Sequence, residues 1–95
     1  MEKEEKKIRR RYIFSGSVQG VGFRYRTAKA ANIVGITGWV RNEYDGTVMA
    51  EFQGTPSQFG EVIKLIEQGS YIQIDKVDVT DIPIDENEID FNIRH

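Results

Sequence analysis

The 95-residue chain has no cysteine, only two prolines, and a single histidine, which stands at position 95. Without cysteine the chain can form no disulfide, thiolate zinc site, iron-sulfur cluster or cysteine nucleophile. One histidine leaves no pair for a metal and no internal imidazole for a serine-histidine-aspartate arrangement. Most hydrolase mechanisms are therefore excluded, and we expect neither a metal nor a cofactor.

Long hydrophobic runs are also missing. No window approaches about 18 apolar residues, so the sequence predicts neither a signal peptide nor a transmembrane helix. We therefore expect a cytoplasmic protein that does not bind membranes, and we expect it to be a monomer. With 39% hydrophobic and 29% charged residues, a chain of this length supports one small globular domain and excludes a second.

The net charge of −2 is unevenly distributed. Residues 1–11 hold six basic and three acidic groups, residues 12–74 hold five of each, and residues 75–95 hold two basic and seven acidic groups. A basic arm can attract nucleic acid or an anionic membrane, but a solvated leader is the commoner meaning of such a run. We interpret residues 1–7 as a flexible charged leader and residues 8–95 as the domain.

The first half of the domain has clear periodicity. Residues 8–14 alternate aromatic and β-branched side chains with arginines and predict a strand. Residues 22–34 have helical spacing and are followed by Gly35, at the place of a left-handed cap. Residues 37–42 and 47–53 have a period of two and flank an Asp-Gly pair, which favours a β-hairpin turn.

The second half begins with a helix signal. Thr55 is placed to cap, Pro56 takes the first helical position, and Gln58 completes a capping box, while Gly69 marks the expected end of this helix. Strands are expected near 76–80 and 91–93. The order β-α-β-β-α-β plus a short final strand predicts an α+β, ferredoxin-like split βαβ sandwich, with an antiparallel sheet and two helices on one face.

The glycine-rich loop before the first helix is the candidate site. No Ser, Thr, Asp or Asn stands between Val18 and Arg24 to cap the helix, and its first turn carries Arg24 and Arg26 where acidic residues are favoured. Glycines at positions 16, 20 and 22 allow successive N–H groups to face one phosphate. A glycine-rich turn with surface arginines is the alternative; the pattern is neither a Walker A nor a Rossmann motif.

Two segments settle this choice by resemblance. Residues 16–24, GSVQGVGFR, resemble the phosphate-binding signature G-x-V-Q-G-V-x-F-R of the acylphosphatase family. Residues 38–48, GWVRNEYDGTV, resemble the second signature of that family, and Gly54 follows at the expected spacing. The resemblance covers residues 12–93 and implies the same split βαβ fold. Gly22 stands where the family varies and often carries a larger residue, which leaves the rigidity of the loop open.

The resemblance implies hydrolysis of acyl phosphates to a carboxylate and inorganic phosphate, with acyl phosphate as substrate and phosphate as product and inhibitor. It implies two catalytic residues: Arg24 would bind phosphate oxygens and Asn42 would orient the attacking water. The phosphate-binding loop would comprise Ser17, Val18, Gln19, Gly20, Val21, Gly22 and Phe23. The resemblance implies a reaction without a metal, which is consistent with a carboxylate leaving group that needs no strong acid.

Two other classes of function stay open. A non-enzymatic anion-binding or regulatory module would bind phosphate without turnover, and it differs from the enzyme at Asn42. An RNA-binding domain has a similar topology, but residues 47–53 lack its aromatic segment and the isoelectric point near 5.4 disfavours nucleic acid. We therefore expect no nucleic-acid partner.

Other conspicuous side chains have simpler interpretations. We expect the aromatic residues Phe23, Trp39, Phe52 and Phe91 to be core residues, because they fall on the apolar faces of their elements. The acidic residues of 85–90 lack a calcium-loop pattern, so we interpret them as a solvated turn.

Overall fold

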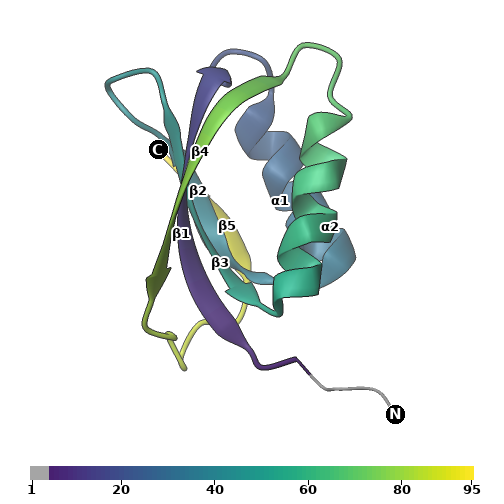
Figure 1. Cartoon of the computed structure of the whole chain (residues 1–95), viewed down its shortest axis with the longest axis vertical. Helices are drawn as coiled ribbons and strands as arrows, with labels where there is room; N and C mark the ends of the chain where they lie inside the picture. Colours follow the sequence, from purple (N-terminus) through teal and green to yellow (C-terminus); the bar gives the residue numbers. More distant parts are fainter. Residues whose placement is uncertain (1–4) are drawn as a thin grey trace.

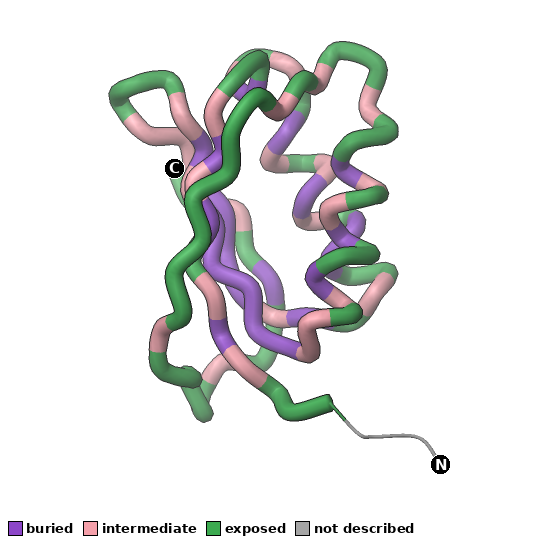
Figure 2. Tube along the Cα trace, in the orientation of Figure 1, coloured by how far each residue is buried: buried purple, intermediate pink, exposed green. Residues whose placement is uncertain are grey.

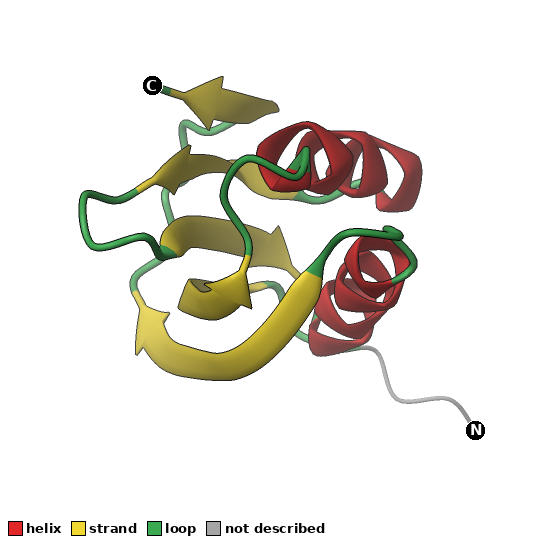
Figure 3. Ribbon diagram, turned by 90° about the horizontal axis from the view of Figure 1, so that it is seen from above, coloured by secondary structure: helices red, strands yellow, loops and turns green. Residues whose placement is uncertain are grey.

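Seven elements follow one another along residues 5–95, the part of the chain that this computed structural model describes. They are β1 (Ile8–Ser17), α1 (Phe23–Val34), β2 (Thr37–Asn42), β3 (Val48–Gly54), α2 (Pro56–Glu67), β4 (Gln73–Ile82) and β5 (Phe91–Arg94). The strands form one sheet in the order β4-β1-β3-β2-β5, and both helices lie on the same face of it (Figure 1, Figure 3). The predicted ferredoxin-like arrangement is confirmed.

One detail of the predicted sheet is wrong, because the sheet is mixed and not antiparallel throughout. Strands β1 to β4 pair antiparallel, whereas β5 pairs parallel with β2. The reason is the 83–90 connection, which leaves β4 at one edge of the sheet and passes below the sheet to the other edge (Figure 1). The returning strand must then run opposite to β4, which is the direction of β2.

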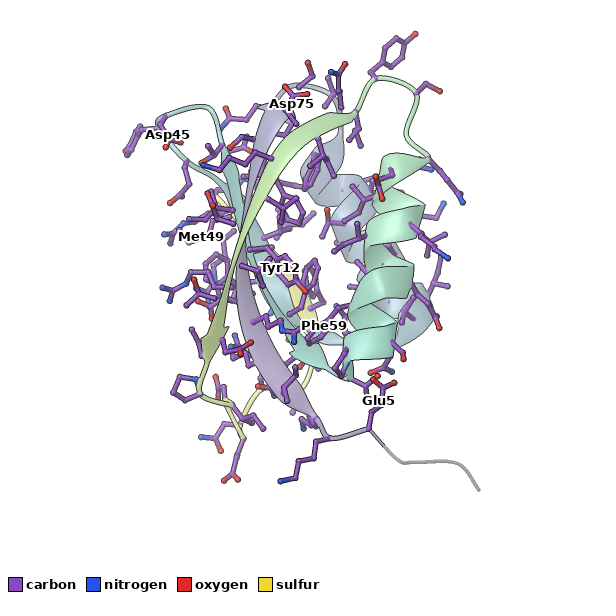
Figure 4. The ribbon with its side chains drawn as sticks, viewed as in Figure 1. Glu5, Tyr12, Asp45, Met49, Phe59 and Asp75 are labelled. Atoms are coloured by element: carbon purple, nitrogen blue, oxygen red, sulfur yellow. The ribbon has the colours of Figure 1, made fainter. Side chains whose placement is uncertain are left out.

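The core lies between the sheet and the helices, and it is mostly aromatic. Phe14, Phe52 and Phe59 are fully enclosed, and the central strands are buried while β4 is exposed along its length (Figure 2). Tyr12 of β1 and Phe59 of α2 point toward one another, with ring centroids 6.2 Å apart in an edge-to-face arrangement (Figure 4). Such packing contributes about 0.5–1.5 kcal/mol per aromatic pair beyond the buried area.

The two helices begin and end differently. Gly35 caps α1 in the left-handed conformation, as predicted. Thr55 and Gln58 form the predicted capping box at the start of α2. Gly69 does not end α2, because the helix stops at Glu67 with Gln68 in a right-handed cap. A Cβ at Gly69 would lie 2.7 Å from Ile72 Cδ1, the end of a flexible side chain.

Buried polar side chains fix the connection between β4 and β5. Arg9 is 5% exposed and donates to both carboxylate oxygens of Glu88, at 2.8 and 3.0 Å. Arg9 also pairs with Glu51 of β3, and the Gln53 amide bonds the backbone of Asp85 in both directions. The acidic turn is therefore partly a structural anchor. No group of three potential metal ligands occurs within residues 5–95.

The leader expected over residues 1–7 falls partly outside the described residues, because residues 1–4 are not among them. Residues 5–7 have no regular structure, and Glu5 accepts hydrogen bonds from Ser57 at the start of α2 (Figure 4). In the described part of the chain, neither helix has the length and apolarity needed to cross a membrane.

Candidate active site

The loop between β1 and α1 is held at both of its ends. Val18 and Phe23 are each 1% exposed, and their side chains belong to the core. Gly16 lies at a bulge in the pairing of β1 with β4, where a Cβ would come within 2.3 Å of the Gln73 carbonyl oxygen. The backbone of residues 19–22 therefore spans two fixed points at one end of the sheet.

Glycines give this loop its shape. Gly20 and Gly22 have φ values of 73° and 78°, in the left-handed region that other residues rarely adopt. Gly22 takes the N-cap position of α1 and provides no side-chain cap, and the first turn holds no acidic residue. Within residues 5–95, the amides of residues 18–23 donate to no protein acceptor. These donors and the positive end of the helix dipole are suited to an anion.

Gln19 ties the loop to the neighbouring hairpin. Its side-chain amide donates to the backbone carbonyls of Glu43, at 2.7 Å, and Thr47, at 2.8 Å. These two residues flank the turn of the β2–β3 hairpin, whose tip carries Asp45 (Figure 4). The side-chain amide of Gln19 is thus used in a structural contact. Only the backbone N–H of Gln19 is available to bind phosphate.

A pocket of about 280 Å³ lies beside the loop. Arg24 enters it from the first turn of α1, and Asn42 enters it from the last position of β2. The other residues that line it are Val18, Gly20, Gly22, Phe23, Tyr25, Ile93 and His95. The structure thus brings four of the seven predicted loop residues together with both predicted catalytic residues, while Ser17, Gln19 and Val21 do not line the pocket.

His95 lies in the same pocket, although the sequence alone predicted no role for this residue. Arg24 Nη1 is 3.3 Å from the Arg94 carbonyl oxygen and 3.3 Å from His95 Nδ1. A guanidinium only donates, so the imidazole nitrogen accepts. Arg41 pairs with Arg94 across the parallel strands, which places Asn42 and His95 at one level. The sequence alone did not predict that the final strand pairs parallel with β2, and this pairing is what brings His95 to the pocket.

Side chains on the opposite face of the sheet hold β5 against β2. Trp39 is buried, as expected, but it lies on the face away from the helices. The guanidinium of Arg94 is 4.5 Å from its ring centroid and that of Arg41 is 5.1 Å away. These cation-π contacts join β5 to β2 and fix the strand that ends in the pocket.

The pocket contains a fixed positive side chain. Arg24 is permanently protonated, and no aspartate or glutamate side chain lies among the residues of 5–95 that line the pocket. Arg24 provides a planar set of donors that matches phosphate oxygens, and the Asn42 amide can both donate to and accept from a water molecule. The arrangement is suited to holding a phosphoryl group beside a positioned water.

Residues 10–93 match the sequence profile of the acylphosphatase family. The chain is 42% identical over 84 residues to an acylphosphatase of Picrophilus torridus, covering 88% of this chain and 99% of that one. It is 38% identical over 89 residues to an acylphosphatase of Bifidobacterium longum, covering 92% of each. The crystal structure of acylphosphatase from Bacillus subtilis superposes with a TM-score of 0.83 at 29% identity, covering 93% of this chain and 99% of that one.

Proposed function

The chain belongs to the acylphosphatase family, and we propose how its loop, Arg24 and Asn42 divide the work of the reaction. The protein is an enzyme that hydrolyses acyl phosphates to a carboxylate and inorganic phosphate. The proposal concerns the roles of the individual residues. It depends chiefly on one observation: one pocket is lined by Arg24, Asn42 and four loop residues whose amides have no protein acceptor within residues 5–95, namely Val18, Gly20, Gly22 and Phe23.

In the proposed complex the phosphoryl group lies against the loop. Loop amides within residues 18–23 donate to its oxygens, and Arg24 donates to two of them through its planar guanidinium. Binding requires Arg24 Nη1 to exchange its long contacts with Arg94 and His95 for phosphate oxygens. The preformed positive field then stabilises the charge that spreads over the equatorial oxygens in the transition state.

Asn42 orients the attacking water through its side-chain amide. Arg24 cannot remove a proton from that water, so the proton passes to a phosphate oxygen of the substrate. The water oxygen forms the new bond to phosphorus as the bond to the acyl oxygen breaks. The bonding pair stays with the leaving carboxylate, which needs no strong acid.

Release of phosphate from acetyl phosphate in the presence of EDTA tests the proposal of a metal-independent site. We expect turnover in the chelator, and poor turnover of p-nitrophenyl phosphate, because the alkoxide or phenoxide of a monoester is a worse leaving group than a carboxylate. Loss of activity in EDTA that a divalent cation restores would contradict the proposed mechanism.

The surroundings of the enzyme also belong to the proposal. Inorganic phosphate should act as a competitive product inhibitor, because it matches the group bound by the loop. We further propose a cytoplasmic monomer without nucleic-acid or membrane partners. Light scattering of the purified protein and cell fractionation test the oligomeric state and the location.

A further inference from the structure

A groove adjoins the phosphate pocket on the side away from the hairpin. It has a volume of about 330 Å³ and lies between the start of α1 and the connection from α2 to β4. Gly22 and Tyr25 line both the pocket and the groove, so the two adjoin each other at these residues. The groove continues along Arg26 and Lys29, which face the same side of the helix as Gly22 because they follow it at positions i+4 and i+7.

The position of this groove fits the departure of the leaving group. Asn42 and His95 line the pocket at its other end, where it meets a hollow beside the hairpin. The hairpin, the β1–α1 loop and the α2–β4 connection lie in that order along one end of the molecule (Figure 1). In phosphoryl transfer the attacking and leaving oxygens are roughly in line. Water held by Asn42 therefore requires the acyl group to leave toward the groove.

The groove is also positively charged. Arg26 is anchored through a 2.8 Å hydrogen bond to the Leu65 carbonyl of α2, whereas Lys29 forms no ion pair within residues 5–95. None of the described residues that line the groove is acidic. In the hollow beside the hairpin, Arg41 is instead neutralised by Glu43 at 2.8 Å.

We propose that this groove is the acyl-binding subsite, and that Lys29 makes it selective for acyl groups that carry a second negative charge. The inference rests on the proposed function, because it takes the phosphoryl group to lie against the loop. Lys29 lines the groove seven residues beyond Gly22, about 10 Å along the helix, and helical side chains generally lean toward the N-terminal end, where the loop lies. The exposed residues Tyr25 and Tyr71 also line the groove, and their rings suit a flat aromatic acyl group.

Benzoyl phosphate and 4-carboxybenzoyl phosphate test the proposal, because they share a ring and differ in one distal carboxylate. We expect the wild-type enzyme to have a kcat/KM about threefold to fivefold higher for the carboxylated substrate at low salt, as for an exposed ion pair. The preference should fall as salt is raised. Lys29→Gln should bring the ratio of the two substrates close to one.

Lys64→Gln is the matched control, since Lys64 is an exposed lysine of α2 outside the groove. This variant makes the same change in net charge and should keep the wild-type ratio. A wild-type ratio near one, or an equal loss of preference in both variants, would overturn the proposal. Acetyl phosphate tests hydrolysis separately from the proposed acyl-binding subsite, because its acyl group is too short to approach Lys29. An enzyme that turns over acetyl phosphate but does not distinguish the aromatic pair refutes the subsite alone.

Discussion

The side-chain amide of Gln19 lies 2.7 Å from the backbone carbonyl oxygen of Glu43, the residue that directly follows Asn42. The phosphate loop and the end of β2 are therefore joined by one side chain, which also bonds Thr47. Arg24 and Asn42 come from different elements, and their relative position depends on that joint. This contact gives the first prediction.

Replacing Gln19 by methionine keeps the length of the side chain and removes both donors. We expect kcat/KM for acetyl phosphate to fall about tenfold or more, since small displacements of reacting groups are costly. Thermal unfolding should show a folded protein. Gln68→Met, at an exposed position after α2, serves as the control and should behave as wild type. Wild-type kcat/KM in Gln19→Met would remove the positioning role.

Phosphate should stabilise the fold through the loop. At a hundredfold excess over Kd the gain is about 2.7 kcal/mol, measured as a rise in Tm against equal ionic strength of chloride. Gly20→Ala should lose most of this gain and cost about 1–2 kcal/mol, because alanine resists the φ of 73°. Gly60→Ala, inside α2 with open space around it, should keep the phosphate effect. An equal response of the two variants to phosphate would argue against the loop.

The buried pair of Arg9 with Glu51 and Glu88 should matter more than its surface counterpart. Arg9→Met leaves Glu88 without its buried partner and Glu51 paired only with Arg11, and it should lower the free energy of unfolding by about 3–5 kcal/mol. Arg10→Met removes a pair with the exposed Asp81 and should cost about 0–1 kcal/mol. Urea unfolding of both variants measures the difference, and similar losses would show that burial has no such effect.

The burial of Tyr12 should make the free energy of unfolding depend on pH in the alkaline range. Burial raises the pKa of this phenol above its ordinary value near 10. Because the pKa of Tyr12 is higher in the folded state than in the unfolded state, its contribution to the free energy of unfolding is fully present below pH 10. That contribution is lost as pH rises above this value. Tyr12→Phe should flatten this loss between pH 9 and 11 in urea titrations, whereas the exposed Tyr44→Phe should not. An unchanged slope in Tyr12→Phe would contradict the assignment.

Most of the fold was predictable because its signals are local. The Asp-Gly turn, Gly35 at the end of α1 and the capping box of Thr55 each specify a boundary within a few residues. The parallel pairing of β5 was missed, because it depends on where an eight-residue connection carries the chain. That path is fixed by contacts between residues distant in sequence, such as Arg9 with Glu88.

The candidate site divides in the same way. The loop, Arg24 and Asn42 could be predicted, because they belong to two motifs that are each continuous in the sequence. His95 and the groove at Lys29 were not visible, because they arise where β5 and the α2–β4 connection meet α1. The Gln19 contact was likewise hidden, since an amide in a loop has no pattern that reveals its partner.

In the proposed mechanism Arg24 binds the phosphoryl group and Asn42 orients the water, so the loss of each side chain should have a different effect. Arg24→Ala should abolish both phosphate binding and turnover, and Arg24→Lys should restore little, because an ammonium lacks the planar set of donors. Neither side chain belongs to the core, so circular dichroism should show folded protein for every variant.

The most direct test is a paired measurement on Asn42→Ala, with phosphate binding by calorimetry and kcat on acetyl phosphate. We predict a phosphate Kd within about twofold of wild type, because Arg24 and the loop stay in place, and a kcat lower by about 10²-fold or more. A wild-type kcat would contradict the account by removing the role of Asn42 in positioning water. A phosphate affinity lost together with kcat would contradict it equally, by making Asn42 a binding residue like Arg24.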